Sequence, residues 1–236
     1  MSLSPTDRIF VALDTPDVDL AVSLAEKLKG HVGGVKLGME FYYANGPAGA
    51  RAVTNVGMPL FLDLKFHDIP NTVAGAVRST LDLKPAILNV HAQGGPAMMQ
   101  AAQAALDDAA GEKPLLIAVT VLTSLGDDDL HAIGVNDGAE SQVVRLATLT
   151  QTCGLGGVVC SPREIKAIRT ACGGDFKLVV PGIRPEWAAV GDQKRITTPS
   201  QAIRDGADYI VIGRPITGAD DPVEAAKRIA DELADL

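Results

Sequence analysis

Eight short apolar runs, typical of β-strands, recur along the 236 residues of the chain and are separated by longer amphipathic stretches. Several runs are almost continuously hydrophobic, as strands covered by helices on both faces should be. The predicted strands are Ile9–Leu13, Gly34–Leu37, Leu60–Leu64, Ile87–Val90, Leu115–Val121, Gly157–Cys160, Lys177–Val180 and Tyr209–Ile212. Helical spacing of apolar residues predicts helices over Val18–Leu28, Thr72–Leu81, Pro96–Ala110, Ser141–Thr152, Pro162–Ala171 and Pro222–Leu233, with a shorter one near Pro199–Arg204.

Eight strand–helix alternations in a chain of this length predict an α/β fold, a (β/α)8 TIM barrel that forms one catalytic domain over residues 1–236. The main alternative is a doubly wound open sheet. Such a sheet usually has fewer strands, and here no glycine-rich dinucleotide turn follows the first run. Ser161-Pro162 and Asp221-Pro222 each place a capping residue before a proline, which is typical of helix starts.

Composition excludes several classes of protein. The net charge is −8 and no basic patch is visible, so we expect no nucleic-acid partner. Cys153, Cys160 and Cys172 lack the spacing of a zinc site or a disulfide framework, and they fit a reducing compartment. No apolar run approaches the roughly 20 residues of a membrane span, and Met1–Asp7 lacks the features of a signal peptide. We therefore expect a cytoplasmic protein.

Polar and charged residues gather where the predicted strands end. In a (β/α)8 barrel the active site lies at this end of the strands. These residues are Asp14, Lys36, Asp63, Lys65, Asp68, Asn89, His91, Thr120, Thr123, Ser124, Pro181, Gly182, Arg184, Gly213 and Arg214. Charges are otherwise scarce within the strands, so this clustering indicates a functional site.

Asp63 and Lys65 are two residues apart and would point to the same side of a strand, here the barrel interior. With Lys36 and Asp68 they can alternate in sign and keep one another charged. A lysine flanked by carboxylates stays an ammonium, which is a poor Schiff-base nucleophile and a good proton donor to a carbanion. A neighbouring carboxylate repels an anionic substrate group, and loss of that group as carbon dioxide relieves the repulsion. The pattern favours decarboxylation followed by protonation of carbon.

Two segments after the last strands indicate a phosphate-binding site. Val180–Arg184 follows the seventh predicted strand and Ile212–Pro215 follows the eighth. Barrels frequently bind phosphate at these two loops. Gly213 allows close approach of the backbone, and Arg214 can offer a bidentate fork to phosphate oxygens. The irregular stretch between about 182 and 199 is long enough to act as a lid.

The segment Phe61–Thr72, FLDLKFHDIPNT, resembles the signature of the orotidine 5′-monophosphate decarboxylase family, bacterial type. The resemblance extends in order along the chain from about residue 9 to 215. The other matching segments are Val11–Asp14, Val35–Gly38, Thr120–Ser124, Pro181–Pro185, Gly191–Gln193 and Ile212–Pro215. The pattern DxKxxD within the first segment is shared with a wider barrel superfamily and is less specific.

This resemblance implies conversion of orotidine 5′-monophosphate to uridine 5′-monophosphate and carbon dioxide, the last step of de novo pyrimidine synthesis, without a cofactor or metal. It implies that Lys65 protonates C6 of the pyrimidine, that Asp63 faces the departing carboxylate, and that Lys36 and Asp68 complete the charge array. The implied substrate-binding residues are Asp14, Lys36, Asn71, Thr72, Thr123, Ser124, Pro181, Arg184, Gln193, Gly213 and Arg214. The resemblance further implies a homodimer in which Asp68 and Thr72 reach into the neighbouring subunit's site.

Two other functions fit parts of the same pattern. One is a magnesium-dependent sugar-phosphate decarboxylase or hexulose-phosphate synthase, in which Asp14, Asp63 and Asp68 would ligate the metal. Lys36 and Lys65 would then place positive charge beside the metal ion, which argues against this function. The other is an inactive nucleotide-binding barrel, for which buried like charges near a substrate carboxylate are not needed.

Overall fold

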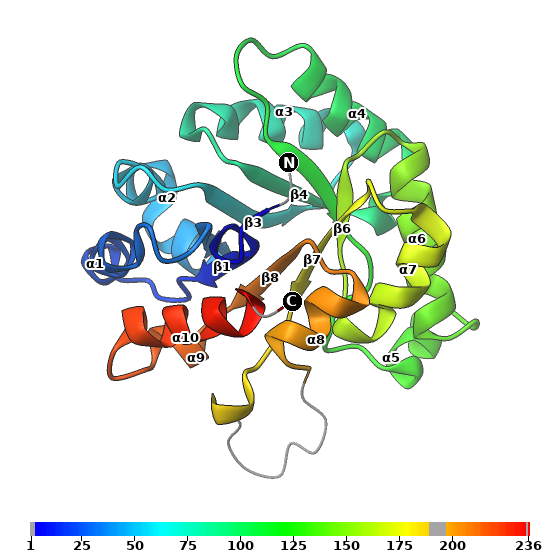
Figure 1. Ribbon diagram of the computed structural model, residues 1–236. Coiled ribbons are helices and arrows are strands. Elements are labelled where there is room, and N and C mark those ends of the chain that lie inside the picture. The colour runs from blue at the N-terminus through cyan, green and yellow to red at the C-terminus, as the bar shows by residue number, and fades with distance from the viewer. Residues whose placement is uncertain (1–2, 189–196, 235) are drawn as a thin grey trace.

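A computed structural model describes residues 3–188, 197–234 and 236 of the chain. Eight parallel strands pair in sequence order and close into a barrel, because β1 also pairs with β8. The strands occupy the centre of the molecule and the helices form a ring around them (Figure 1). The strands are β1 Ile9–Ala12, β2 Gly34–Gly38, β3 Leu60–Phe66, β4 Ile87–His91, β5 Leu115–Val119, β6 Gly157–Val159, β7 Lys177–Pro181 and β8 Tyr209–Ile212. The predicted (β/α)8 fold is confirmed.

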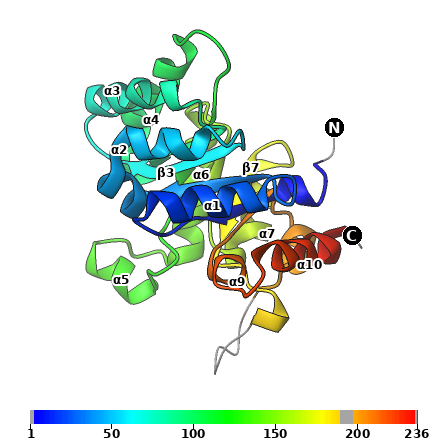
Figure 2. The same cartoon turned by 90° about the vertical axis from the view of Figure 1, so that its left-hand side faces the viewer.

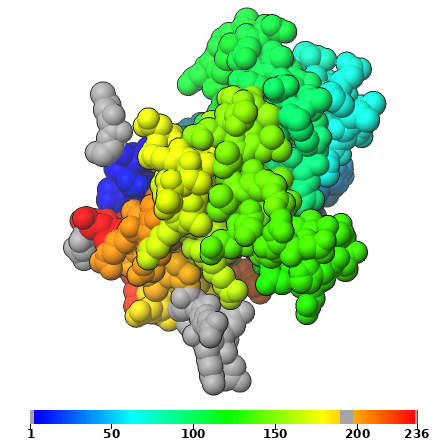
Figure 3. Space-filling model, turned by 90° about the vertical axis from the view of Figure 1, so that its right-hand side faces the viewer, coloured from blue at the N-terminus to red at the C-terminus, as the bar shows by residue number. Residues whose placement is uncertain are grey.

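Helices cover the outer face of the barrel. Viewed from the side, the part of the chain that holds α5, α6 and α7 forms a continuous layer over the strands (Figure 3). The two chain ends lie on one side of the barrel (Figure 2). The helices are α1 Val18–Leu28, α2 Met39–Thr54, α3 Pro70–Thr80, α4 Gly95–Asp107, α5 Asp127–Ala132, α6 Ala139–Thr152, α7 Ile165–Cys172, α8 Pro199–Asp205, α9 Arg214–Thr217 and α10 Pro222–Ala234. In the described ranges, none of these helices combines the length and apolar character needed to cross a bilayer.

The helix starts expected at two Ser/Asp-Pro pairs are present. The Ser161 hydroxyl accepts a hydrogen bond from the backbone N–H of Arg163, at the beginning of a 3-10 turn that leads into α7. The Asp221 carboxylate accepts two backbone N–H groups in the first turn of α10. These side chains satisfy donors that the first turn of a helix leaves unpaired.

Alternate residues of a strand face either the helices or the barrel interior. Ile9 packs in the large core between strands and helices, whereas Phe10 packs in a smaller cluster inside the barrel. Phe10 meets Phe61 and Tyr209 edge to face, with ring centroids 6.4 and 5.6 Å apart. A Cβ on Gly34 would lie 2.5 Å from the Phe10 ring, so this β2 position must be glycine. Three of the few aromatic residues thus fill the barrel interior.

The same alternation directs polar side chains into the barrel at the carboxyl ends of the strands. Lys36, Asp63 and Asn89 each stand between two strand residues that pack in the outer core. Their side chains therefore point inward, above the layer that contains Phe61. All three are buried. The inward positions of β2, β3 and β4 thus change from apolar to polar toward the carboxyl ends of the strands.

Strand β3 contains a β-bulge near its carboxyl end. Leu62 pairs with Leu88 and Phe66 pairs with Val90, so four steps along β3 correspond to two steps along β4. Lys65 lies in this bulge with a left-handed backbone, at φ 52°. Such a conformation in a non-glycine residue costs on the order of 1–3 kcal/mol, and it persists only where the surroundings hold it.

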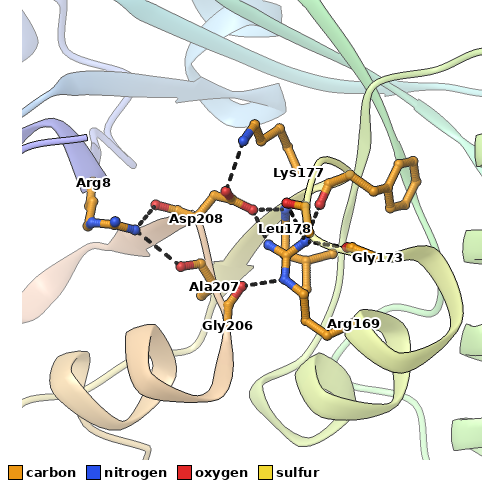
Figure 4. A network of polar contacts seen from close by, with 10 residues as sticks. Arg8, Arg169, Gly173, Lys177, Leu178, Gly206, Ala207 and Asp208 are labelled. Carbon is orange, nitrogen blue, oxygen red and sulfur yellow. Dashed lines mark hydrogen bonds and ion pairs between the residues drawn. The ribbon is translucent and has the colours of Figure 1, made fainter. Parts of the chain in front are cut away.

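A polar network ties the loops at the opposite end of the barrel together. The Arg169 guanidinium, from α7, forms an ion pair with Asp208 and donates hydrogen bonds to the carbonyls of Gly206 and Phe176 (Figure 4). Asp208 also accepts Lys177 Nζ at 3.1 Å and the Leu178 backbone N–H at 2.9 Å. Because it joins the starts of β7 and β8 far from the functional end, this network serves the stability of the barrel.

Candidate active site

Four charged side chains form a row that alternates in sign across the ends of β1, β2 and β3. Lys36 Nζ lies 3.2 Å from Asp14 Oδ1 and 3.3 Å from Asp63 Oδ2. Lys65 Nζ lies 2.6 Å from Asp63 Oδ1. The predicted meeting of Asp63, Lys65 and Lys36 is therefore present, in the order Asp14, Lys36, Asp63, Lys65. We call this the charge row.

The inner members of the charge row are buried and its ends are open. Lys36 and Asp63 are 9% and 8% exposed, whereas the Asp14 side chain is 60% exposed. Burial by itself would raise the pKa of Asp63, but Lys36, Lys65 and the hydrogen bonds from Lys65 and Asn89 together hold that pKa below its ordinary value. Asp63 is therefore an anion at neutral pH, and Lys65 Nζ lies beside it at the open end of the row.

Asp68 lies outside the charge row within one chain. It follows the end of β3, is exposed, and accepts the Ile69 backbone N–H at 2.6 Å through Oδ1. The second carboxylate of the row is supplied instead by Asp14, which the resemblance implied as a substrate-binding residue and not as a member of the charge array. Asp68 lies two residues beyond the end of β3, in the loop before α3, where strand alternation no longer sets the direction of a side chain.

Asn89 joins the row in a way that the sequence did not predict. It lies in β4 and is completely buried. Its Nδ2 donates to Asp63 Oδ1 at 2.7 Å, and its Oδ1 accepts the Lys65 backbone N–H at 2.8 Å. The position of Asn89 near the end of a predicted strand was the only signal in the sequence.

His91 closes the site on the β4 side. Its ring stacks on His67, with centroids 5.2 Å apart. Burial, followed by the charges of His67 and Lys65, lowers the pKa of His91 to about 4. His91 is therefore neutral at physiological pH and adds no positive charge beside Lys65. Its Nδ1 is buried without a hydrogen-bond partner among the described residues.

Two arginines converge beyond the ends of β7 and β8. Arg184 and Arg214 line the same cavity of about 420 Å³. The Arg184 backbone N–H donates to the Thr197 carbonyl at 3.0 Å, which fixes the start of the β7 loop. Trp187, on the same segment, packs beneath the Arg228 guanidinium at 4.7 Å. The predicted pair of arginines is thus held at one place on the rim of the barrel.

The cavity lined by Arg184 and Arg214 lies close to the charge row. A Cβ on Gly213, the residue before Arg214, would lie 3.8 Å from Asp14 Oδ2. Gly213 therefore leaves the backbone after β8 open beside the outer end of the row. A phosphorylated molecule held by the arginines can reach the row from this side.

The remaining predicted substrate residues are spread around the mouth of the barrel. Thr123 and Pro181 line a cavity of about 660 Å³ above β5, β6 and β7, a size suited to a small ligand. Ser124 is exposed in the loop after β5, and Asn71 and Thr72 are exposed in the first turn of α3. Gln193 lies outside the described residues, as do residues 189–196 of the predicted lid.

The carboxylates of the site do not form a ready metal centre. Lys36 Nζ stands between Asp14 and Asp63, in the place where a cation bound by both carboxylates would lie. In residues 3–188, 197–234 and 236, no group of three or more His, Cys, Asp or Glu side chains is arranged to hold a metal ion.

The fold and the charge row define a (β/α)8-barrel enzyme whose acid–base groups come from consecutive strands. The chain belongs to the Orotidine 5'-phosphate decarboxylase / HUMPS family, whose model matches residues 7–229. This assignment confirms the resemblance drawn from the Phe61–Thr72 segment.

Individual relatives agree with the family model. The chain is 55% identical over 229 residues to an orotidine 5'-phosphate decarboxylase of Paramagnetospirillum magneticum, covering 95% of this chain and 97% of that protein. It is 56% identical to the enzyme of that name from Rhodospirillum rubrum, covering 99% and 96% of the two chains. The crystal structure of orotidine 5'-phosphate decarboxylase from Lactobacillus acidophilus superposes with a TM-score of 0.84 at 38% identity, covering 95% and 98%.

Proposed function

We propose that this protein converts orotidine 5′-monophosphate to uridine 5′-monophosphate and carbon dioxide, the last step of pyrimidine nucleotide synthesis. The relatives that match almost the whole chain bear the name of this activity. The charge row suits the chemistry, because the reaction needs a place for a carboxylate to leave and a proton donor for the carbon left behind. The arginine pair suits the 5′-phosphate.

The reaction proceeds at the open end of the charge row. The substrate carboxylate lies against Asp63, and their repulsion is relieved when the bond from C6 to the carboxyl carbon breaks. Carbon dioxide leaves without the bonding electrons, and the pair stays on C6. The Lys65 ammonium stabilises this charge and donates a proton to C6, and neutral Lys65 then regains a proton from water. Lys36 keeps Asp63 charged throughout.

The rest of the substrate is held by groups around the barrel mouth. Arg184, Arg214, the Gly213 backbone and Gln193 bind the phosphate, and Asp14 with Lys36 binds the ribose hydroxyls. Thr123 and Ser124 lie by the pyrimidine, and Pro181, Asn71 and Thr72 complete the pocket. Binding energy from the unreactive phosphate helps to press the carboxylate toward Asp63, so it contributes to the rate as well as to affinity.

The position of Lys36 is the observation that carries this proposal. The Lys36 ammonium already occupies the place between Asp14 and Asp63, so magnesium would have to compete with a fixed positive charge. This favours the nucleotide decarboxylase over the magnesium-dependent sugar-phosphate enzymes. The test is to follow absorbance of orotidine 5′-monophosphate with enzyme kept in excess EDTA. Full turnover, with no product from sugar phosphates, supports the proposal; activity that requires added magnesium contradicts it.

We also propose that two copies of the chain share their sites. Asp68 and Ile69 are exposed at the rim of the mouth, and Ile69 is 67% exposed although apolar. Both line a surface hollow of about 510 Å³ together with Pro70. Asp68, which lines this hollow, and Thr72, which is exposed in the first turn of α3, would enter the partner's site, where Asp68 would place a second carboxylate near Lys65. Residues 1–236 act as one catalytic domain in this dimer, and three buried free cysteines suit the reducing cytoplasm.

A further inference from the structure

We propose that Asn89 is a positioning residue that holds the bulged end of β3, so that Lys65 and Asp63 meet in the geometry needed for proton transfer. The inference rests on the proposed decarboxylation and concerns a residue that does not itself touch the reacting atoms. It is carried by three observations: the bulge, the left-handed backbone of Lys65, and the two hydrogen bonds of a completely buried amide.

The bulge removes the normal support for Lys65. Two more residues lie on β3 than on β4 between the pairs Leu62–Leu88 and Phe66–Val90. The ladder hydrogen bonds of a regular parallel pair are interrupted there, and the backbone N–H of Lys65 needs another acceptor. Its left-handed conformation is unfavourable for a residue with a Cβ. Something outside the β3 ladder must therefore hold this residue.

The Asn89 side chain supplies that support. Its Oδ1 accepts the Lys65 backbone N–H at 2.8 Å, as a strand carbonyl would in an unbroken ladder. Its Nδ2 donates to Asp63 Oδ1 at 2.7 Å. The orientation of the amide is fixed by its two partners, because the reversed amide would set donor against donor and acceptor against acceptor. Asn89 thus fixes the separation between the backbone of Lys65 and the carboxylate of Asp63.

The hydrogen bonds of Asn89 also determine where the Lys65 ammonium lies. Asp63 Oδ1 receives both Asn89 Nδ2 and Lys65 Nζ, while Oδ2 faces Lys36 at 3.3 Å. The Asn89 amide therefore fixes the plane of the Asp63 carboxylate, and this carboxylate positions the amines of both lysines. Without it, Asp63 can rotate and the left-handed turn can relax, and the proton donor moves from its place. A small displacement of a catalytic group can lower a rate about 10²-fold.

The Asn89→Asp variant separates this role from a general structural one. The substituted side chain keeps an oxygen for the Lys65 N–H but places a second carboxylate against Asp63. Two carboxylates in contact share a proton, which raises the pKa of one of them. As the pH falls, the introduced carboxyl group becomes protonated and regains an O–H donor toward Asp63. At pH 8 the kcat of the variant should therefore be about 10²-fold below that of the wild type. The ratio of variant to wild-type kcat should rise as the pH falls toward 5.

Two further variants serve as comparisons. Asn89→Ala removes both hydrogen bonds and has nothing to titrate, so its ratio to wild-type kcat should stay low at every pH. Thr150→Val removes a buried hydroxyl from α6, remote from the site, and should leave kcat within about threefold of wild type. A pH-independent ratio for Asn89→Asp, or kcat within about threefold of wild type for Asn89→Ala, would overturn the inference.

Hydrogen exchange provides a readout that does not depend on turnover. The Lys65 amide should be protected in the wild type and in Asn89→Asp, and unprotected in Asn89→Ala. Equal protection of that amide in all three proteins would contradict the role of Asn89. Absence of turnover by the wild-type enzyme contradicts the proposed function instead, and the exchange experiment still decides whether Asn89 holds Lys65. If Asn89→Ala does not fold, the pH dependence of kcat in the nearly isosteric Asn89→Asp still decides the inference, because a pH-independent ratio to wild type would overturn it.

Discussion

Lys65 Nζ lies 2.6 Å from Asp63 Oδ1, and Lys65 itself has a left-handed backbone. In the proposed reaction, this pair joins the proton donor to the carboxylate that faces the leaving group. Asp63 is shared with Lys36, so the donor belongs to a row whose charges balance one another. The proposed chemistry depends on the whole row, and each of its parts can be tested separately.

Removing the amine of Lys65 should stop the reaction without preventing binding. Lys65→Ala lacks the proton donor for C6, so kcat should fall by on the order of 10³-fold or more. The phosphate and ribose contacts remain, and titration with uridine 5′-monophosphate should give an affinity within about tenfold of wild type. Turnover above a tenth of the wild-type rate would remove Lys65 from the role of acid.

The arginines that bind the phosphate should contribute to the reaction rate as well as to substrate affinity. Arg214→Ala should lower kcat/KM by at least ~10²-fold, which corresponds to about 2.7 kcal/mol of transition-state binding. Arg204→Ala, which removes an exposed arginine at the end of α8, should leave kcat/KM unchanged and serves as the control. The phosphate assignment is wrong if both variants behave like the wild type.

The shared-site dimer predicts complementation between two inactive variants. Lys65→Ala and Asp68→Ala should each be inactive alone. In a mixed dimer one site combines Lys65 of one chain with Asp68 of the other, so co-expression should restore about a quarter of wild-type activity under random pairing. Activity that stays at background in the purified mixed dimer, or a monomer in sedimentation, would contradict the proposal.

The half-buried His91 should make stability depend on pH. In the unfolded chain its imidazole binds a proton below about pH 6.5, whereas in the folded chain the pKa is about 4. The native state therefore loses stability as pH falls from 6.5 toward 4, because only the unfolded chain gains this proton. Denaturant unfolding should show a smaller loss over that range for His91→Gln than for the wild type. Parallel losses in the two proteins would show that His91 does not cause the dependence.

The polar network at the other end of the barrel should affect stability alone. Arg169→Ala leaves Asp208 and several loop carbonyls without partners, so unfolding free energy should fall by about 3 kcal/mol. Arg145→Ala breaks an ion pair that is exposed on both sides, and it should cost less than about 1 kcal/mol. The folded variants should both keep wild-type kcat. Equal losses of stability would show that burial does not distinguish the two pairs.

The fold was predictable because its signal repeats. Each buried strand is an apolar run, and all eight predicted strands are present with ends that differ by no more than about two residues. The helix α2 was not predicted. Gly46 and Pro47 interrupt its apolar spacing, and the helix accommodates them with a kink at Gly46, where φ is 61°. Local propensity argued against a helix that packing in the barrel nevertheless stabilises.

The site was predictable only in part. Parallel strands bring their carboxyl ends to one edge, so Lys36, Asp63 and Lys65 could be expected to meet. The support that Asn89 gives to Lys65 depends on the bulge in β3, whereas Asp14 and Asp68 lie in loops beyond the ends of β1 and β3, where strand alternation does not set the direction of a side chain. Bulges follow from strand pairing across the sheet, and no local pattern in the sequence specified this one.

A crystal structure with uridine 5′-monophosphate bound would test the central claim most directly. The account predicts C6 of the pyrimidine within hydrogen-bond reach of Lys65 Nζ, and the phosphate between Arg184 and Arg214. The opposite outcome is a nucleotide whose phosphate lies away from both arginines, or a Lys65 amine turned out of the pocket and away from Asp63. Either of these would contradict the proposed decarboxylation at this site.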